Sequence, residues 1–159
     1  MVAYAERDGH DAELWGVTGL LHDADYERFP DMDDPDRGHP RTIMAELVER
    51  DAPAEMVRAI ASHADFLGVA PESEMERTLV AVDELCGFLV ACSVVRPEGI
   101  RGLTPKSVKK KLKQPSFAAA VSREDMCVAA PRSWAATLTS TRMSRSSSRR
   151  WRRGRMSWG

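Results

Sequence analysis

The spacing of apolar residues between positions 71 and 95 constrains the fold of this chain most strongly. Met75, Leu79, Val82, Cys86 and Leu89 follow one another at steps of four, three, four and three residues. This spacing places them on one face of an α-helix, which must pack against other helices. Prolines stand mostly at expected helix starts, and the chain has no Asn-Gly hairpin turn. The sequence therefore predicts an all-α fold.

Proline and capping residues divide the rest of the chain into shorter helices. The expected elements are a helix over 11–22 with Leu14, Val17, Leu20 and Leu21 inward, an acidic loop over 23–38, a helix over 40–48, a helix opened by Pro53 that carries His63, the long helix from about Pro71 to the break at 96–99, and a basic helix capped by Thr104-Pro105 and ended by Pro115. Ser122-Arg123-Glu124-Asp125 has the pattern of a capping box and predicts one more helix start.

The charge pattern divides the chain into two parts near Cys127. Residues 1–126 carry 15 basic and 24 acidic side chains, whereas residues 127–159 carry eight arginines and no acid. The length of the first part suits one domain with a buried core. We therefore expect a helical domain over 1–126, followed by an Arg/Ser-rich tail over 127–159.

Cysteine content and hydropathy predict a cytoplasmic protein. The chain has three cysteines and no C-x-x-C pair, which argues against a disulfide framework and against a thiolate zinc site. The longest uncharged stretch, residues 85–95, is too short to cross a bilayer. The first residues lack the basic flank and the apolar stretch of a secretion signal. No membrane partner is expected.

Two adjacent potential metal ligands, His22 and Asp23, follow Leu20-Leu21 at the end of the first expected helix. Imidazole and carboxylate groups bind hard or borderline divalent metals. Because the backbone leaves helical geometry there, both side chains can turn toward one ion. The alternative, which is commoner for this pattern alone, is a helix C-cap in which His22 interacts with the helix dipole and Asp23 opens a turn.

Further candidates lie along the later helices. Asp83 and Glu84 both have uncharged neighbours three and four residues away, so a buried carboxylate there needs a partner. The periodicity does not decide which of the two side chains points inward. Either a salt bridge or a metal ion would satisfy the carboxylate that does. His63 lies among apolar residues, where a lone histidine is usually a hydrogen-bonded core residue. His39, beside Pro40, would usually be an exposed cap.

Taken together, these residues resemble a known family. The order His-Asp, His, His, Asp at positions 22, 23, 39, 63 and 83 resembles the HD-domain metal-dependent phosphohydrolases, in particular the compact HDIG-type bacterial proteins. The resemblance covers residues 3–126 and is carried by Leu14-Trp15-Gly16, Gly19-Leu20-Leu21-His22-Asp23-Ala24-Asp25-Tyr26-Glu27, Ser62-His63-Ala64-Asp65, Asp83-Glu84-Leu85-Cys86-Gly87-Phe88 and Lys106-Ser107-Val108-Lys109-Lys110-Lys111.

The resemblance implies an HD-domain-like helical bundle that binds one or two divalent ions. The implied ligands are His22, Asp23, His39, His63 and Asp83, with Asp23 as the bridging and catalytic ligand. Such ligands accept Mn, Fe, Co, Ni, Zn or Mg. The implied activity is hydrolysis of a small phosphorylated substrate by metal-activated water, with no nucleophilic side chain.

Lys109 and Lys110 are candidates for binding the substrate phosphate. The alternative is that this lysine run forms a solvated helix face, which is the commoner role of such a run.

The sequence departs from the family pattern at both ends. The family's first metal-binding histidine lies upstream of the segment that resembles Ala3-Tyr4-Ala5, so we expect weaker metal binding and an impaired hydrolase. His10, in the following turn, is not assumed to replace it. The family would continue the helix after Met126 with an acidic segment, and a reading-frame shift near Cys127 is one hypothesis for the Arg/Ser/Trp-rich tail.

Two alternative functions remain at this point. The chain could be a metal-binding but inactive remnant of the family. Residues 145–155 interleave arginine, serine and a tryptophan, as RNA-binding segments do, so the tail could instead bind nucleic acid. That alternative, which we consider the weaker one, predicts salt-dependent RNA binding that is lost when the residues after Met126 are deleted.

Overall fold

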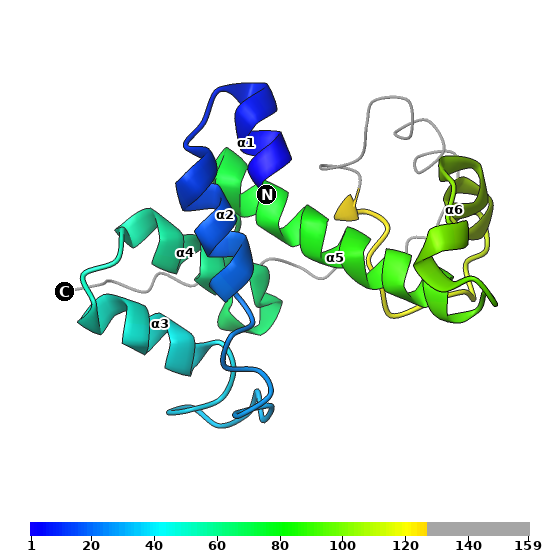
Figure 1. The fold of residues 1–159 in the computed structure, drawn as a ribbon. Coiled ribbons are helices and arrows are strands. Elements are labelled where there is room, and N and C mark those ends of the chain that lie inside the picture. Colours follow the sequence, from blue (N-terminus) through cyan, green and yellow to red (C-terminus); the bar gives the residue numbers. More distant parts are fainter. Residues whose placement is uncertain (127–159) are drawn as a thin grey trace. The chain divides into compact units, whose positions relative to one another are not determined.

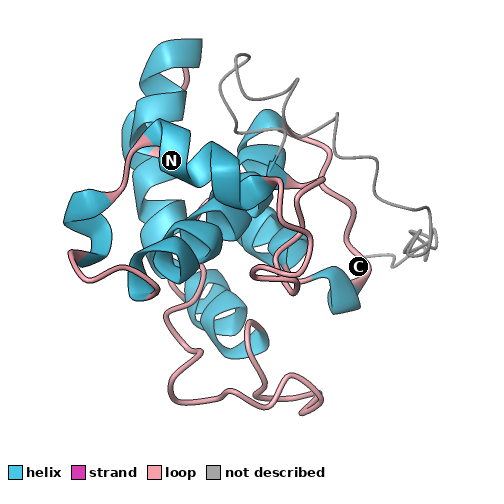
Figure 2. Cartoon of the chain, turned by 90° about the vertical axis from the view of Figure 1, so that its right-hand side faces the viewer, coloured by secondary structure: helices cyan, strands magenta, loops and turns pink. Residues whose placement is uncertain are grey.

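The computed structural model describes residues 1–126, and every regular element in that range is a helix (Figures 1 and 2). The elements are α1 (Val2–Asp8), α2 (Ala12–Leu21), α3 (Arg41–Glu49), α4 (Ala54–His63), a 3-10 helix (Asp65–Leu67), α5 (Glu74–Val94), a second 3-10 helix (Gly99–Gly102) and α6 (Pro105–Leu112). The prediction of an all-α fold is confirmed. The predictions for the tail, residues 127–159, lie outside the described residues. None of the helices within 1–126 is long and apolar enough to cross a membrane.

The described chain forms two compact units, residues 1–79 and 80–126, and α5 begins in the first unit and ends in the second. The first unit contains α1 to α4 and buries two groups of apolar side chains. One group is Ala5, Trp15, Ala59, Met75 and Leu79, and the other is Ile43, Leu47, Met56 and Ile60. The second unit has a core of its own, so the two units are described separately.

In the first unit, α1 packs on α2 through two glycines. A Cβ atom at Gly16 would lie 2.8 Å from Val2 Cγ2, and one at Gly19 would lie 2.5 Å from Met1 Cγ. These distances are too short for a methyl group, so the absence of a side chain allows the close approach of the two helices. The sequence analysis did not predict α1.

The expected inward face of α2 is correct only in part. Leu14 and Leu21 pack against the core, but Val17 is 37% exposed and Leu20 is 78% exposed. The side chain that is buried instead is Trp15, which is 5% exposed. Because α2 has a single charged residue, apolar side chains occur on all its sides, and their periodicity did not identify the buried face.

The long helix begins later than Pro71. The Ser73 side chain accepts a hydrogen bond from Glu76 N at 3.2 Å, and Glu76 Oε2 accepts hydrogen bonds from the N–H groups of Glu72 and Ser73 at 2.6 and 3.3 Å. This reciprocal arrangement is a capping box, which satisfies backbone donors at the helix start. The helix therefore starts at Glu74, and Ser73 is the residue that positions it.

The apolar stripe predicted on the long helix is correct only in part. Met75 and Leu79 are buried, as expected, whereas Cys86 is exposed. In the second half the buried residues are Phe88 and Cys92, and Leu89, as predicted, packs against the same core. The buried face of α5 changes along the helix. Its first turns pack in the core of the first unit, and its later turns pack in the core of the second.

In the second unit, α6 contributes Val108 and Leu112 to the core around Phe88. Its predicted cap is confirmed, since the Thr104 side chain accepts a hydrogen bond from Ser107 N at 3.2 Å and the Ser107 side chain accepts one from Thr104 N at 3.1 Å. The basic residues of α6 lie on its other sides.

Of the capping box predicted at Ser122-Arg123-Glu124-Asp125, the structure contains one hydrogen bond. The Ser122 side chain accepts a hydrogen bond from Asp125 N at 3.3 Å, as expected for a capping residue. The N–H of Ser122 donates to Glu84 Oε2 at 2.6 Å. Of the two carboxylates that periodicity did not separate, Glu84 therefore has a structural partner within the second unit.

Arg123 holds together the loop that follows α6. Its side chain is 5% exposed and lies over the Phe88 ring, with the guanidinium carbon 5.3 Å from the ring centroid. The guanidinium donates hydrogen bonds to the carbonyl groups of Leu112, Gln114, Phe117, Ala118 and Val121. Burial lowers the pKa of Arg123, and the carbonyl oxygens offset the cost of burying the charge.

We predict that Arg123→Ala lowers the free energy of unfolding by roughly 2–3 kcal/mol, because several carbonyl groups lose their donor. Urea denaturation measures the change, with Arg101→Ala, at an exposed arginine of the same unit, as the control. Equal stability of the two variants would show that Arg123 does not support the loop.

Candidate metal centre

His22 and Asp23 lie at the C-terminal end of α2. His22 is the C-cap residue, as the alternative interpretation of the sequence predicted, and its Nδ1 bonds to the carbonyl oxygen of Gly19 at 2.9 Å. Carbonyl groups in the last turn of a helix have no partner within the helix, so they accept hydrogen bonds from nearby side chains. This bond fixes the His22 ring and leaves Nε2 on its far side.

His63 has the same arrangement at the end of α4. It is the last residue of that helix, and its Nδ1 bonds to the carbonyl oxygen of Ile60 at 2.5 Å. The bond to the carbonyl three residues earlier matches the one made by His22. Two helix C-termini thus each orient an imidazole by means of their own unpaired carbonyl groups.

His39 reaches the same place from the loop before α3. It is 3% exposed, so the exposed cap that its position beside a proline suggested is wrong. Its backbone N–H donates to the carbonyl of Phe29 at 2.9 Å, and its ring atom Nδ1 lies 2.7 Å from Asp25 Oδ1. Its Nε2 is therefore directed away from Asp25.

The three histidines converge on the Asp23 carboxylate. Asp23 Oδ1 lies 3.3 Å from His39 Nε2 and 3.5 Å from His63 Nε2, and these two nitrogens are 3.3 Å apart. His22 Nε2 lies 3.4 Å from Asp23 Oδ2. The structure thus brings together four of the five ligands implied by the family resemblance.

This geometry fits a divalent cation. Ligand atoms bonded at about 2.1 Å to one ion lie roughly 3.0–3.4 Å apart in octahedral or tetrahedral coordination, close to the separations found around Asp23. A neutral imidazole whose Nδ1–H donates to an acceptor keeps a lone pair on Nε2. Ligand atoms of His22, Asp23 and His63 all lie within 4.8 Å of one another, so this group could hold a metal ion.

The electrostatic environment favours the ionised form of Asp23. The adjacent His63 ring lowers the pKa of the carboxyl group most strongly, the other two histidines act in the same direction, and partial burial opposes them. The side chain is 50% exposed. Asp23 is therefore a carboxylate at neutral pH and presents both oxygens to a cation.

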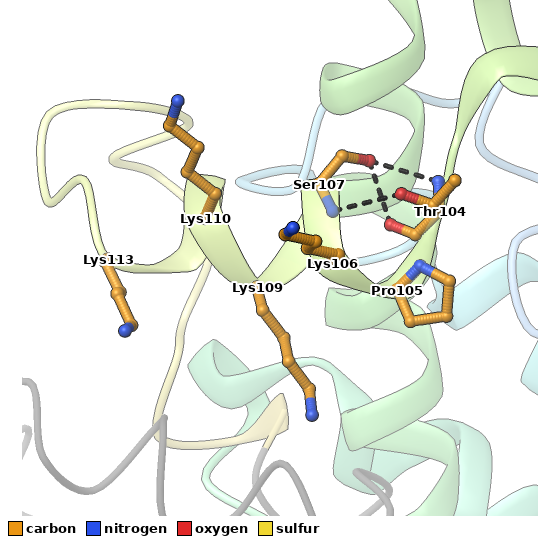
Figure 3. A pocket seen from close by; sticks show the side chains of 7 residues that line it. All are labelled: Thr104, Pro105, Lys106, Ser107, Lys109, Lys110 and Lys113. Carbon is orange, nitrogen blue, oxygen red and sulfur yellow. Dashed lines mark hydrogen bonds between the residues drawn. The ribbon is translucent and has the colours of Figure 1, made fainter.

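The other predicted site residues belong to the second unit. Asp83 lies on α5 beyond the boundary at residue 79, so its role as a fifth ligand stays a prediction. Lys109 and Lys110 lie on α6 and line an open depression together with Lys106, Lys113 and the first turn of the helix. Figure 3 shows the Lys109 and Lys110 side chains extending in opposite directions from α6. Their role in phosphate binding stays a prediction.

Two residues of this region were not among the predicted site residues. Asp25 is 4% exposed and contacts His39, and the Tyr26 ring meets the His39 ring edge-on with 5.1 Å between centroids. Both lie in the segment directly after His22-Asp23, and Asp25 is separated from Asp23 by one residue. The fourth histidine, His10, bonds to Glu74 instead.

Comparisons with protein-family models, with curated proteins and with solved structures find no match for this chain.

The position of His39 depends on a glycine that has no room for a side chain. A Cβ atom at Gly38 would lie 2.0 Å from the carbonyl oxygen of Asp31 and 2.7 Å from that of Asp34. Both neighbours are backbone atoms, so the loop itself would have to open. Because Gly38 is bonded directly to His39, this opening would displace the imidazole.

We predict that Gly38→Ala lowers the free energy of unfolding by about 2 kcal/mol, through overpacking, and weakens binding of Co²⁺. The control is Gly87→Ala on α5, where a Cβ meets nothing within 4 Å and alanine stabilises a helix by up to about 1 kcal/mol. Urea denaturation and titration with Co²⁺ measure both effects. Unchanged stability in Gly38→Ala would contradict the assigned packing of the loop.

Proposed function

We propose that the cluster of His22, Asp23, His39 and His63 holds a divalent cation and that the protein is a metal-dependent phosphohydrolase. The cation is one of Mn, Fe, Co, Ni, Zn or Mg, because imidazole and carboxylate ligands accept all of these. The hydrolase activity rests on the resemblance to the HD-domain phosphohydrolases.

One observation carries this proposal. The Nδ1 atom of each of the three histidines bonds to an oxygen acceptor, namely Gly19 O, Asp25 Oδ1 and Ile60 O. The Nε2 lone pairs consequently face one carboxylate from three sides. Nitrogen lone pairs and a carboxylate brought this close are stabilised by a positive charge among them, and a hydrogen-bonded second ring nitrogen is the usual arrangement of metal-binding histidines.

The role of each residue follows from its position. A bound divalent cation supplies Lewis acidity, which makes water a nucleophile near neutral pH and neutralises charge on phosphoryl oxygens. The three imidazoles would hold the cation through their Nε2 lone pairs, and Asp23 would add one negative charge. The half-exposed Asp23 side chain keeps the cluster open to a ligand from solvent, as a catalytic site requires.

The substrate is a small phosphorylated molecule. Nucleotides, cyclic dinucleotides, inorganic phosphates and sugar phosphates all present the phosphoryl oxygens that such a cation would bind. Lys109 and Lys110 are the proposed phosphate-binding residues outside the cluster. Assays with one representative of each class, in the presence of each candidate metal, would identify the substrate class.

We predict that Asp23→Ala lowers the affinity for Mn²⁺ or Co²⁺ by more than about 100-fold, because loss of a group that only hydrogen-bonds to a ligand already costs about 10- to 100-fold. Hydrolysis of phosphoesters should be lost in the same variant. Isothermal titration calorimetry and phosphate release in the presence of metal measure the two effects.

The matched control for this experiment is Asp36→Ala. It removes the same charge from the same acidic loop, at an exposed position outside the cluster. Wild-type protein that binds no divalent metal would refute the proposed site. Wild-type protein that binds metal at this cluster but hydrolyses none of the substrates would support the inactive, metal-binding alternative.

A further inference from the structure

The Asp25 carboxylate is buried and contacts both an imidazole ring and a backbone N–H group. Its Oδ1 lies 2.7 Å from His39 Nδ1, and its Oδ2 accepts a hydrogen bond from the backbone N–H of Ile43 at 2.9 Å. Both Asp25 and His39 are nearly inaccessible, at 4% and 3% exposure. The two oxygens of one carboxylate therefore have separate, fixed partners.

The bond to Ile43 serves the start of α3. The N-cap residue of this helix is Pro40, which provides no side-chain acceptor, and Ile43 is the third residue of the first turn. The N–H groups of a first turn have no partner within the helix. Asp25 supplies the missing acceptor from the preceding loop. The donor, the backbone N–H of Ile43, cannot rotate or lose its proton.

The hydrogen bond between Asp25 and His39 Nδ1 corresponds to the Nδ1 hydrogen bonds that the other two histidines make within their own helices. His22 and His63 stand at helix C-termini, where a carbonyl group three residues earlier accepts a hydrogen bond from Nδ1. His39 precedes a helix instead, and the carbonyl groups of α3 point toward the other end of that helix. An acceptor for its Nδ1 has to come from a different part of the chain.

We propose that Asp25 is the positioning residue that selects the tautomer of His39. By accepting a hydrogen bond from Nδ1–H, it keeps the proton off Nε2, the atom that faces Asp23 and His63. Asp25 does not itself touch the cation. This inference rests on the proposed metal centre for its functional meaning, whereas the tautomer itself is a property of the metal-free protein.

Asp25→Asn tests this role because the two partners of Asp25 decide how the new amide is oriented. The Ile43 N–H is a permanent donor, so the amide oxygen has to face it. The amide NH₂ group then faces His39 Nδ1 and donates to it. Nδ1 becomes the acceptor, the proton moves to Nε2, and His39 can no longer act as a ligand through that atom. Both hydrogen bonds and the helix cap are kept.

The first measurement is the ¹⁵N chemical shift of the His39 ring nitrogens in metal-free protein, because protonated and unprotonated ring nitrogens give well-separated resonances. We expect Nδ1–H in the wild type and Nε2–H in Asp25→Asn, while urea denaturation gives similar stability for both. His39→Ala identifies the resonances. An unchanged tautomer, or Nε2–H already present in the wild type, would overturn the proposal.

The second measurement is the dissociation constant for Co²⁺. Asp25→Asn should weaken binding by 10- to 100-fold, whereas Asp33→Asn, the same change at an exposed position in the same loop, should leave the affinity unchanged. In a His39→Ala background, Asp25→Asn should have no further effect, because Asp25 acts through His39. Additive effects of the two substitutions would overturn the proposal.

The two experiments separate this inference from the proposed function. If wild-type protein does not bind Co²⁺, the metal centre fails, but the tautomer of His39 still tests the role of Asp25. If Asp25→Asn loses stability while the tautomer of His39 stays the same, Asp25 is only a helix cap, and the metal centre stands without it.

Discussion

The candidate site depends on the fixed orientation of three imidazole rings. Each ring has its Nδ1 bonded to an oxygen acceptor, and the opposite nitrogens of His22, His39 and His63 consequently lie around Asp23. Without these bonds, each ring could flip or change tautomer, and the lone pairs would not converge. The helices of the first unit serve to bring these locally oriented rings to one place.

Local backbone chemistry accounts for two of the three orientations. A helix C-terminus leaves several carbonyl groups unsatisfied, and a histidine in the last turn can satisfy one of them. The interpretation of His22 as a helix cap and its interpretation as a metal ligand are therefore compatible, because the bond that caps the helix also directs the other ring nitrogen toward Asp23. The third orientation needs a long-range partner, which Asp25 provides across 14 residues.

The sequence predicted those features that depend on local chemistry. Helix starts marked by capping residues, such as Asp11 and Thr104, lie where they were expected, and the order of His and Asp residues pointed to four side chains that do cluster. The buried face of α2 and the second half of the stripe on α5 depend on tertiary packing, which periodicity does not determine. Asp25 was missed because its neighbours in sequence do not indicate its burial.

The charge distribution of the first unit bears on the role of the proposed cation. Residues 1–79 carry 19 acidic and seven basic side chains, so the unit that contains the cluster attracts cations and repels phosphate esters. Residues 80–126 carry eight basic and five acidic side chains. A divalent cation bound beside the single Asp23 carboxylate would make the cluster itself positive and so favour a phosphate group there. If the proposed phosphohydrolase activity is present, the metal would therefore contribute to substrate binding as well as to hydrolysis.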